Sequence, residues 1–422
     1  MSKNQIFAIY DVPDISSPIK LFDNTNSEIK DIIKTLEIDG DKVSKISEYY
    51  TFESEGLHAV TFILNSQLET MSGLFLDCYY LQEVDFSGLD TSKVTSMSEL
   101  FKRCFSLANI EFGKINTSKV TNMEKMFLGC GNLVNLDLSS FNTSKVTDMN
   151  NMFSACSSLK SLNLTSLDTS NVENMNNMFC SCTNLKEIDL THLNTAKVKD
   201  MNSMFYGCKK LEALDLSNFN TKNVEDMHGL FAHCKKLSFL YITNFNTQKV
   251  KYMQHMFDSC NSLVFLDLSN FSTDLVENMK FMFFSCNSLK SLDLSTFNIE
   301  KVKDLRNMFH GCTSLVMLDL SNFGQNSATE VNYMFSECTS LIQIEMGNFI
   351  SESIKDVSHM FDGCENLNSI NLRRFNMTNV ENYEGIFSGI PNYGSFIFNN
   401  TFSEDIAQLV PGSWEKVQEK NT

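Results

Sequence analysis

Apolar and polar residues alternate in a pattern that repeats along most of this chain. In residues 133–158, Leu136 and Leu138 point one way and Asp137 the other, which is typical of a short β-strand. Residues 142–144 (Asn-Thr-Ser) predict a turn and a helix start, because their side-chain oxygens can accept hydrogen bonds from unpaired backbone N–H groups. The apolar residues that follow are spaced as on one face of a helix of about three turns. They are Val146, Met149, Met152, Phe153 and Cys156.

The repeating unit keeps a constant length of 26 residues. Thirteen phenylalanines recur at this interval from Phe75 to Phe387, and twelve cysteines recur in register with them. The cysteines are Cys78, Cys104, Cys130, Cys156, Cys182, Cys208, Cys234, Cys260, Cys286, Cys312, Cys338 and Cys364. A constant period indicates one supersecondary unit stacked on copies of itself. We therefore expect an α/β solenoid of about 13 strand–turn–helix units. The stack should curve, with a parallel sheet on its concave face, because helices need more room than strands about 4.8 Å apart.

Both ends of the chain depart from the repeat. Residues 1–63 combine strand-like runs at 5–10, 19–22 and 59–64 with a charged helix candidate at 28–36, which predicts a β-rich N-terminal cap. The solenoid is expected to span residues 64–395. Residues 396–422 are expected to form a small C-terminal cap, with a strand at 395–398, a helix at 404–410 and Trp414 as a plug. Caps are needed because an exposed end coil would leave apolar surface and strand edges open.

The charge and composition narrow the classes of partner. A net charge of −17 over 422 residues argues against nucleic acid, which requires clustered Lys and Arg, and favours a cationic protein or peptide. No run approaches the ~20 apolar residues of a membrane span, so membrane insertion is not expected. The first residues carry no secretory signal pattern, and many thiols favour a reducing, intracellular compartment.

The spacing of the cysteines and histidines does not indicate disulfides, a metal site or a catalytic site. One column of cysteines points its sulfurs in parallel, whereas a disulfide needs facing Cβ atoms about 3.8 Å apart and zinc needs a tetrahedral ligand set. We expect buried thiols that pack as small apolar groups. The seven histidines occupy unrelated repeat positions, so we predict no catalytic, cofactor-binding or metal-binding residues and no enzyme activity.

An acidic column occupies the outward position of the predicted strands. Its members are Asp85, Glu111, Asp137, Asp189, Asp215, Asp267, Asp293, Asp319 and Glu345. Like charges about 5 Å apart repel by ~0.8 kcal/mol per pair even at the dielectric constant of water. Either each carboxylate is stabilised locally by the Ser or Thr two residues later, or the column attracts a cationic partner.

Aromatic residues interrupt the small and charged groups of this face in two neighbouring units. Phe239, Tyr241 and Phe265 stand at outward positions, flanked by Asp215 and Asp267. Adjacent strands would place Phe239 and Phe265 about 5 Å apart in one exposed patch. Exposed aromatic side chains on a charged face are typical of binding hot spots. The predicted partner-binding residues are these five together with Asp293 and Asp319; chance hydrophobic drift, or a patch covered by a loop, stays open as the alternative.

The repeat resembles that of the BspA-like leucine-rich-repeat surface proteins, whose unit has the form LDLSNFNTSNVTDMSNMFSGCSSL. Residues 214–227 (LDLSNFNTKNVEDM) and 136–156 match it closely, and residues 50–60 and 411–414 resemble the family's two caps. The resemblance implies a leucine-rich-repeat solenoid, exposure at the cell surface or secretion, adhesion and partner binding. We therefore expect a non-enzymatic interaction protein, an adhesin or a scaffold, that binds its partner on the concave strand face. The alternative is a structural protein that self-associates through the solenoid ends.

Overall fold

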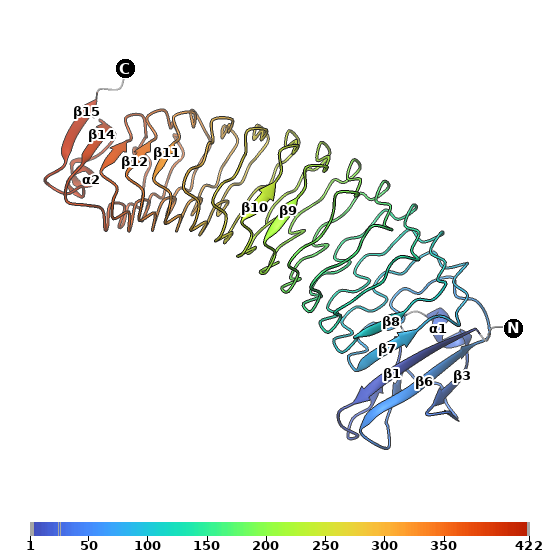
Figure 1. Cartoon of the computed structure of the whole chain (residues 1–422). Helices are drawn as coiled ribbons and strands as arrows, with labels where there is room; N and C mark the ends of the chain where they lie inside the picture. The colour runs from blue at the N-terminus through green and yellow to red at the C-terminus, as the bar shows by residue number, and fades with distance from the viewer. Residues whose placement is uncertain (1–3, 24, 26, 420–422) are drawn as a thin grey trace. The chain divides into compact units, whose positions relative to one another are not determined.

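The structure is a computed structural model, and it describes residues 4–23, 25 and 27–419. The chain forms two compact units, Met1–Val198 with Gly207–Leu211 and Lys199–Tyr206 with Glu212–Thr422. In each unit the chain winds through successive coils of the repeat, as Figure 1 shows, so the predicted solenoid is confirmed. The predicted cap limits include residues 1–3, 24, 26 and 420–422, which lie outside the described residues, and these limits stay a prediction.

The first unit begins with a mixed sheet, mostly antiparallel, that joins the repeats. Its strand order is β4-β3-β6-β1-β7-β8, and β1 pairs antiparallel with both β6 and β7, the strand of the first coil. The strands are β1 (Gln5–Val12), β3 (Ile33–Ile38), β4 (Asp41–Lys42), β6 (Gly56–Leu64), β7 (Leu81–Asp85) and β8 (Asn109–Glu111), with β2 (Ile19–Lys20) and β5 (Tyr49–Tyr50) as a separate pair. The strand runs predicted at 5–10 and 59–64 are thus found, and the run predicted at 19–22 is a strand only at Ile19–Lys20.

The helix predicted at 28–36 is too long. Helix α1 covers Ser27–Ile32, and the chain continues directly as β3. Ile33, Leu36 and Ile38 are buried, and β3 pairs with β6, so strand pairing overrides the local helical preference.

Short strands line one side of the coils, which we call the strand face. In the second unit β9 (Ala213–Asp215) pairs in parallel with β10 (Phe239–Tyr241). A parallel sheet then contains β11 (Met317–Asp319), β12 (Gln343–Glu345), β13 (Ser369–Asn371), β14 (Ser395–Asn399) and β15 (Glu415–Glu419). Helix α2 (Glu404–Gln408) lies between β14 and β15 in the sequence, and Trp414 is buried, as predicted for the C-terminal end.

The parallel sheet is not continuous, which corrects the sequence prediction. Segments 135–137, 161–163, 265–267 and 291–293 are not strands, although their sequences match the pattern. Beside the first two of these lies a hollow of about 590 Å³ that also contacts β8. Strand segments can separate here because the hydrogen bonds that hold one coil to the next are concentrated on the opposite side of the coil.

We call that opposite side the turn face. The prediction that it consists of helices is wrong. Among the described residues of the coils the stretch corresponding to 146–156 is a chain of turns, and the helices of the structure are α1 and α2. The backbone N–H groups alternate between two kinds of acceptor. Those of Met152 and Ser154 bond three residues back, at 3.2 and 3.1 Å. Those of Asn151 and Phe153 bond to carbonyl groups of the next coil, both at 2.9 Å.

The backbone conformation explains why no α-helix forms. Asn151 and Ala155 have φ values of 54° and 57°, in the left-handed region that interrupts an α-helix. Successive three-residue turns still place an apolar residue toward the core every three or four positions, so the periodicity cannot distinguish them from a helix. The expectation of a concave strand face rested on wide helices on the other side, and this physical reason no longer applies.

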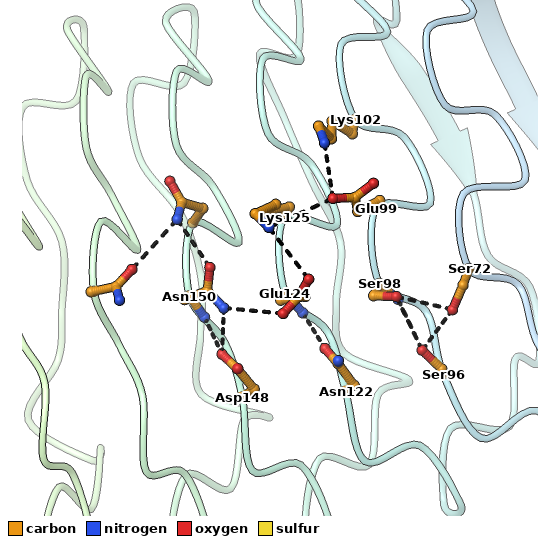
Figure 2. Close-up of polar contacts among 12 residues, drawn as sticks. Ser72, Ser96, Ser98, Glu99, Lys102, Asn122, Glu124, Lys125, Asp148 and Asn150 are labelled. Carbon is orange, nitrogen blue, oxygen red and sulfur yellow. Dashed lines mark hydrogen bonds and ion pairs between the residues drawn. The ribbon is translucent and has the colours of Figure 1, made fainter.

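Polar side chains connect neighbouring coils along the turn face. Figure 2 shows Ser72, Ser96 and Ser98 pointing toward one another, with 2.6 Å between the hydroxyl oxygens of Ser72 and Ser96. Glu124 accepts a hydrogen bond from the amide of Asn150, 26 residues later, at 3.3 Å. Parallel bridges follow the same line, for example from Asn122 to Asp148. These contacts keep the coils in register independently of the strand face.

The core of each coil combines a phenylalanine stack with a column of thiols. Within the second unit Phe257 stacks on Phe231 and Phe283, with 5.6 Å between ring centroids in both pairs. All thirteen cysteines are thiols; the twelve repeat cysteines are buried and Cys180 is half-buried. Each repeat thiol from Cys104 to Cys364 donates to the phenylalanine carbonyl oxygen 29 residues earlier, for example Cys156 to Phe127 at 3.2 Å. A thiol therefore packs as an apolar group and also supplies a weak donor to the preceding coil.

We expect the repeat thiols to resist alkylation in the native protein. Burial raises the pKa of Cys182 and Cys312 to about 12 and that of Cys156 well above the ordinary thiol value, so almost no thiolate forms at neutral pH. Iodoacetamide followed by mass spectrometry should modify Cys180 first, and all thirteen only after denaturation. Rapid modification of several repeat cysteines in folded protein would contradict this arrangement.

Candidate functional site

The predicted partner-binding residues lie in the second unit, on its strand face. Strand β10 alternates, with Leu240 toward the interior and Phe239 and Tyr241 outward. Its register places Phe239 opposite Ala213 and Tyr241 opposite Asp215 of β9. One coil later Leu266 and Leu268 are buried, which turns Phe265 and Asp267 outward in the same sense.

The three aromatic side chains are exposed to solvent. Phe239, Tyr241 and Phe265 keep 61%, 52% and 70% of their surface accessible. We call these three residues the strand-face patch. No loop of the described chain covers the patch, so the alternative that a loop covers these aromatic side chains does not hold.

Phe239 and Phe265 stand at the same position of neighbouring coils, but no strand pairing joins these two positions. No ring contact joins Phe239 to Phe265 in the described chain. The reason is that β10 is hydrogen-bonded to β9 alone, whereas residues 265–267 form no strand. A hollow of about 320 Å³ lies just beyond Tyr241, between this coil and the next, and Thr243, Asn244 and Asn270 contribute to its lining.

The acidic column closes local turns. The carboxylates of Asp267, Asp293 and Asp319 accept hydrogen bonds from the backbone N–H two residues later, at 3.0, 2.9 and 2.9 Å. Asp215 accepts in the same way from Ser217 at 2.9 Å. Each of these carboxylates is therefore stabilised locally, and the repulsion between carboxylates is offset within each coil.

These hydrogen bonds also keep the carboxylates ionised. The Ser269 hydroxyl and backbone N–H lower the pKa of Asp267, although the neighbouring Asp293 opposes the shift. The Ser295 backbone N–H and hydroxyl lower the pKa of Asp293. Both side chains lie at the surface, so the face carries negative charge across the neutral and mildly acidic range.

Sequence reasoning missed several apolar side chains on this face. Met317 is 61% exposed at the position that corresponds to Phe239 and Phe265, and Val264, Val316 and Ile342 are exposed one position earlier. The sequence already indicated these exposed apolar side chains, because the position occupied by Val264, Val316 and Ile342 is a lysine in other coils. These lysines are Lys160, Lys186 and Lys290. A column-by-column comparison of outward positions would have found the change from charged to apolar.

Neither a metal-binding group of side chains nor a membrane-spanning helix is found among the described residues. No group of three or more His, Cys, Asp and Glu side chains there is placed to hold a metal ion. The helices found there are all too short or too polar to span a bilayer.

The solved structures similar to this chain include leucine-rich-repeat proteins of bacteria. A leucine-rich cell surface protein from Faecalibacterium prausnitzii A2-165 is 18% identical, over 74% of this chain and 83% of that one, with a TM-score of 0.43. A leucine-rich-repeat protein from Eubacterium ventriosum is 15% identical, over 74% of this chain and 85% of that one, with a TM-score of 0.38. No curated protein matches the chain.

One family model matches the chain in four overlapping stretches. They cover residues 66–187, 156–263, 238–349 and 316–408. The resemblance to BspA-like leucine-rich-repeat proteins agrees with this match and with the 26-residue period. Since the matched stretches span most of the sequence, the chain belongs to the family described as "Mycoplasma protein of unknown function, DUF285".

Proposed function

We propose that this protein is a non-enzymatic interaction module, an adhesin or a scaffold, that binds a cationic protein or peptide on the strand face of its second unit. The observation that carries the proposal is the strand-face patch. Three large aromatic side chains are more than half exposed on a face whose other outward positions are mainly small or charged. An exposed cluster of this kind costs solubility, and binding of a partner is the usual compensation.

Because the strand face carries acidic residues, we expect the partner to be positively charged. Asp267, Asp293 and Asp319 follow one another along the same face, and Asp215 lies opposite Tyr241 in the β9–β10 register. A partner that presents an apolar or aromatic anchor beside Lys or Arg would match both components. The aromatic anchor would supply most of the affinity, and the charges would supply orientation and a faster association rate. A location at the cell surface is part of the proposal and rests on the resemblance to BspA-like proteins.

Selection from a peptide library tests this proposal without a known partner. The immobilised protein is used to select from a phage-displayed library of random peptides about twelve residues long, with the Phe239→Ser/Phe265→Ser variant for counter-selection. We expect enriched peptides to combine Lys or Arg with aromatic or large aliphatic residues. Peptides that bind the variant equally well, or that are acidic, would contradict the proposed surface.

Removal of three acidic charges should weaken binding of the selected peptide about tenfold, because each charge contributes a few tenths of a kcal/mol. The variant is Asp267→Asn/Asp293→Asn/Asp319→Asn. An asparagine oxygen can still close the turn, as Asn163 does for the N–H of Thr165 at 3.0 Å, so the fold should be retained. Kd is measured by fluorescence anisotropy at several salt concentrations. The slope of log Kd against log salt concentration should be smaller for the variant.

A matched variant separates a local effect from net charge. Asp85→Asn/Asp137→Asn/Asp189→Asn makes the same charge change in the first unit, at the same repeat position. This control should leave Kd nearly unchanged. If both triple variants weaken binding equally, only the overall charge of the protein matters.

A further inference from the structure

One column of the turn face carries aromatic rings where other coils carry small or polar residues. The column is His255, Phe281, Asn307, Tyr333 and His359 in the second unit. His255 stacks on Phe281 with 4.8 Å between ring centroids and 6° between planes. Tyr333 stacks on His359 with 4.7 Å and 12°. Asn307, in the coil between the two pairs, supplies no ring.

The missing ring leaves a slot. Phe281 and Tyr333 are two coils apart, so the gap between them is about 10 Å, twice the spacing of neighbouring chains. One planar ring placed there would continue the stack at the spacing that the flanking pairs already have. A hollow of about 390 Å³ lies at this position, and Phe281, Asn307 and Tyr333 contribute to its lining.

Two residues that line the slot carry buried polar atoms without hydrogen-bond partners. Among the described residues, the buried side-chain atoms that lack a hydrogen bond are His310 Nδ1, Asn332 Oδ1 and Gln254 Oε1. The first two belong to residues that line the hollow. Burial lowers the pKa of His310, so its ring is neutral and Nδ1 can accept or donate according to the tautomer. Asn332 Oδ1 can only accept. A buried polar atom without a partner is costly, and a ligand that donates to it removes the cost.

Charged side chains of both signs surround the slot: Lys280 and Arg306 line it, and Asp304, Glu330 and Asp356 lie close enough to Arg306 to raise its pKa. Arg306 is held by Asp304 through two hydrogen bonds of 3.0 and 2.7 Å. Lys280 forms no ion pair with any described residue. Its ammonium group is therefore available to an anionic group on a ligand whose ring occupies the slot.

Phe281 and Tyr333 have φ values of 58° and 57°, a conformation that is unfavourable for bulky residues. The same repeat position has a positive φ in other coils as well, among them Glu99, Lys125 and Ser203, so the left-handed conformation belongs to the turn of the repeat.

We propose that the slot between Phe281 and Tyr333 binds the base of a purine nucleotide. A purine ring would stack between the two aromatic side chains, and its amino or ring N–H would donate to Asn332 Oδ1. The phosphate would approach Lys280. A free mononucleotide fits better than a nucleic acid strand, since the net charge of −17 disfavours a polyanion. This site lies on the turn face and does not depend on the function proposed for the strand face.

Isothermal titration calorimetry on the full chain tests the proposal, with AMP as the probe. We expect one saturable site per chain. Adenosine, which lacks the phosphate, should bind about tenfold more weakly than AMP, since a charged hydrogen bond contributes about that factor. Lys280→Gln should weaken AMP binding to the level of adenosine and leave adenosine binding unchanged, which a merely structural lysine would not do.

A second variant fills the slot. Asn307→Phe adds the missing ring and should weaken AMP binding at least tenfold while the melting temperature is maintained or raised. Asn177→Phe makes the same change at the same repeat position in the first unit and should leave AMP binding unaltered. Absence of saturable AMP binding, or unaltered binding by Asn307→Phe, would overturn the proposal.

Two competing probes identify the source of the planar group. Tighter binding of a short oligoadenylate than of AMP would support the base slot and assign it to a strand end instead of a free nucleotide. Tighter binding of N-acetylarginine amide than of AMP would overturn the nucleotide proposal, because the slot would then recognise an arginine side chain of a protein.

Discussion

Replacement of Phe257 by alanine is expected to lower the free energy of unfolding by about 3–5 kcal/mol, the usual cost of deleting a buried aromatic ring. Phe257 is fully buried and stacks on both neighbouring rings of its column. Its carbonyl oxygen accepts the thiol hydrogen of Cys286 at 3.1 Å. Loss of the ring would leave a cavity shared by three coils, and each coil is stabilised mainly by its neighbours.

The matched control for this change is Phe265→Ala, eight residues later in the same unit. Phe265 is 70% exposed, so the same truncation should change stability by less than about 0.5 kcal/mol. Urea denaturation followed by circular dichroism measures both variants. Equal destabilisation by the two substitutions would mean that Phe265 is packed, and the strand-face patch would then no longer be an exposed surface.

The double substitution Phe239→Ser/Phe265→Ser is expected to weaken binding of the library-selected peptide by about 2 kcal/mol or more, or about 30-fold. The two rings supply most of the apolar area that the patch exposes. The melting temperature should stay nearly constant, because neither ring contributes to the core. Kd is measured by fluorescence anisotropy, and thermal unfolding is followed in parallel.

Tyr252→Ser provides the control for this second prediction. Tyr252 is also an exposed aromatic residue of the second unit, but it lies in the line of bridges on the turn face, paired with Asp226 and Asn278. It should leave peptide binding unchanged. A fall in melting temperature of the double variant would place the rings in the core, and an unchanged Kd would place the anchor elsewhere.

The sequence was sufficient for the solenoid, its 26-residue period and the identity of the core columns. These features follow from local rules, because identical coils stacked in register bury the same positions in every repeat. The buried thiols and the outward direction of Phe239, Tyr241 and Phe265 followed from the same register. The sequence left two interpretations of the acidic column. The turn hydrogen bonds from residues such as Ser269 and Ser295 show the local stabilisation, and the attraction of a cationic partner stays a prediction.

The tertiary structure alone decided how the backbone of each coil is built. An apolar residue every three or four positions suits a helix and a chain of turns equally, and the choice depends on the left-handed residues such as Asn151 and on bonds to the next coil. The interruption of the sheet and the hollow beside Asn307 are of the same kind. Each depends on contacts between residues about 26 or 52 positions apart, and the pattern within one repeat contains no information about such contacts.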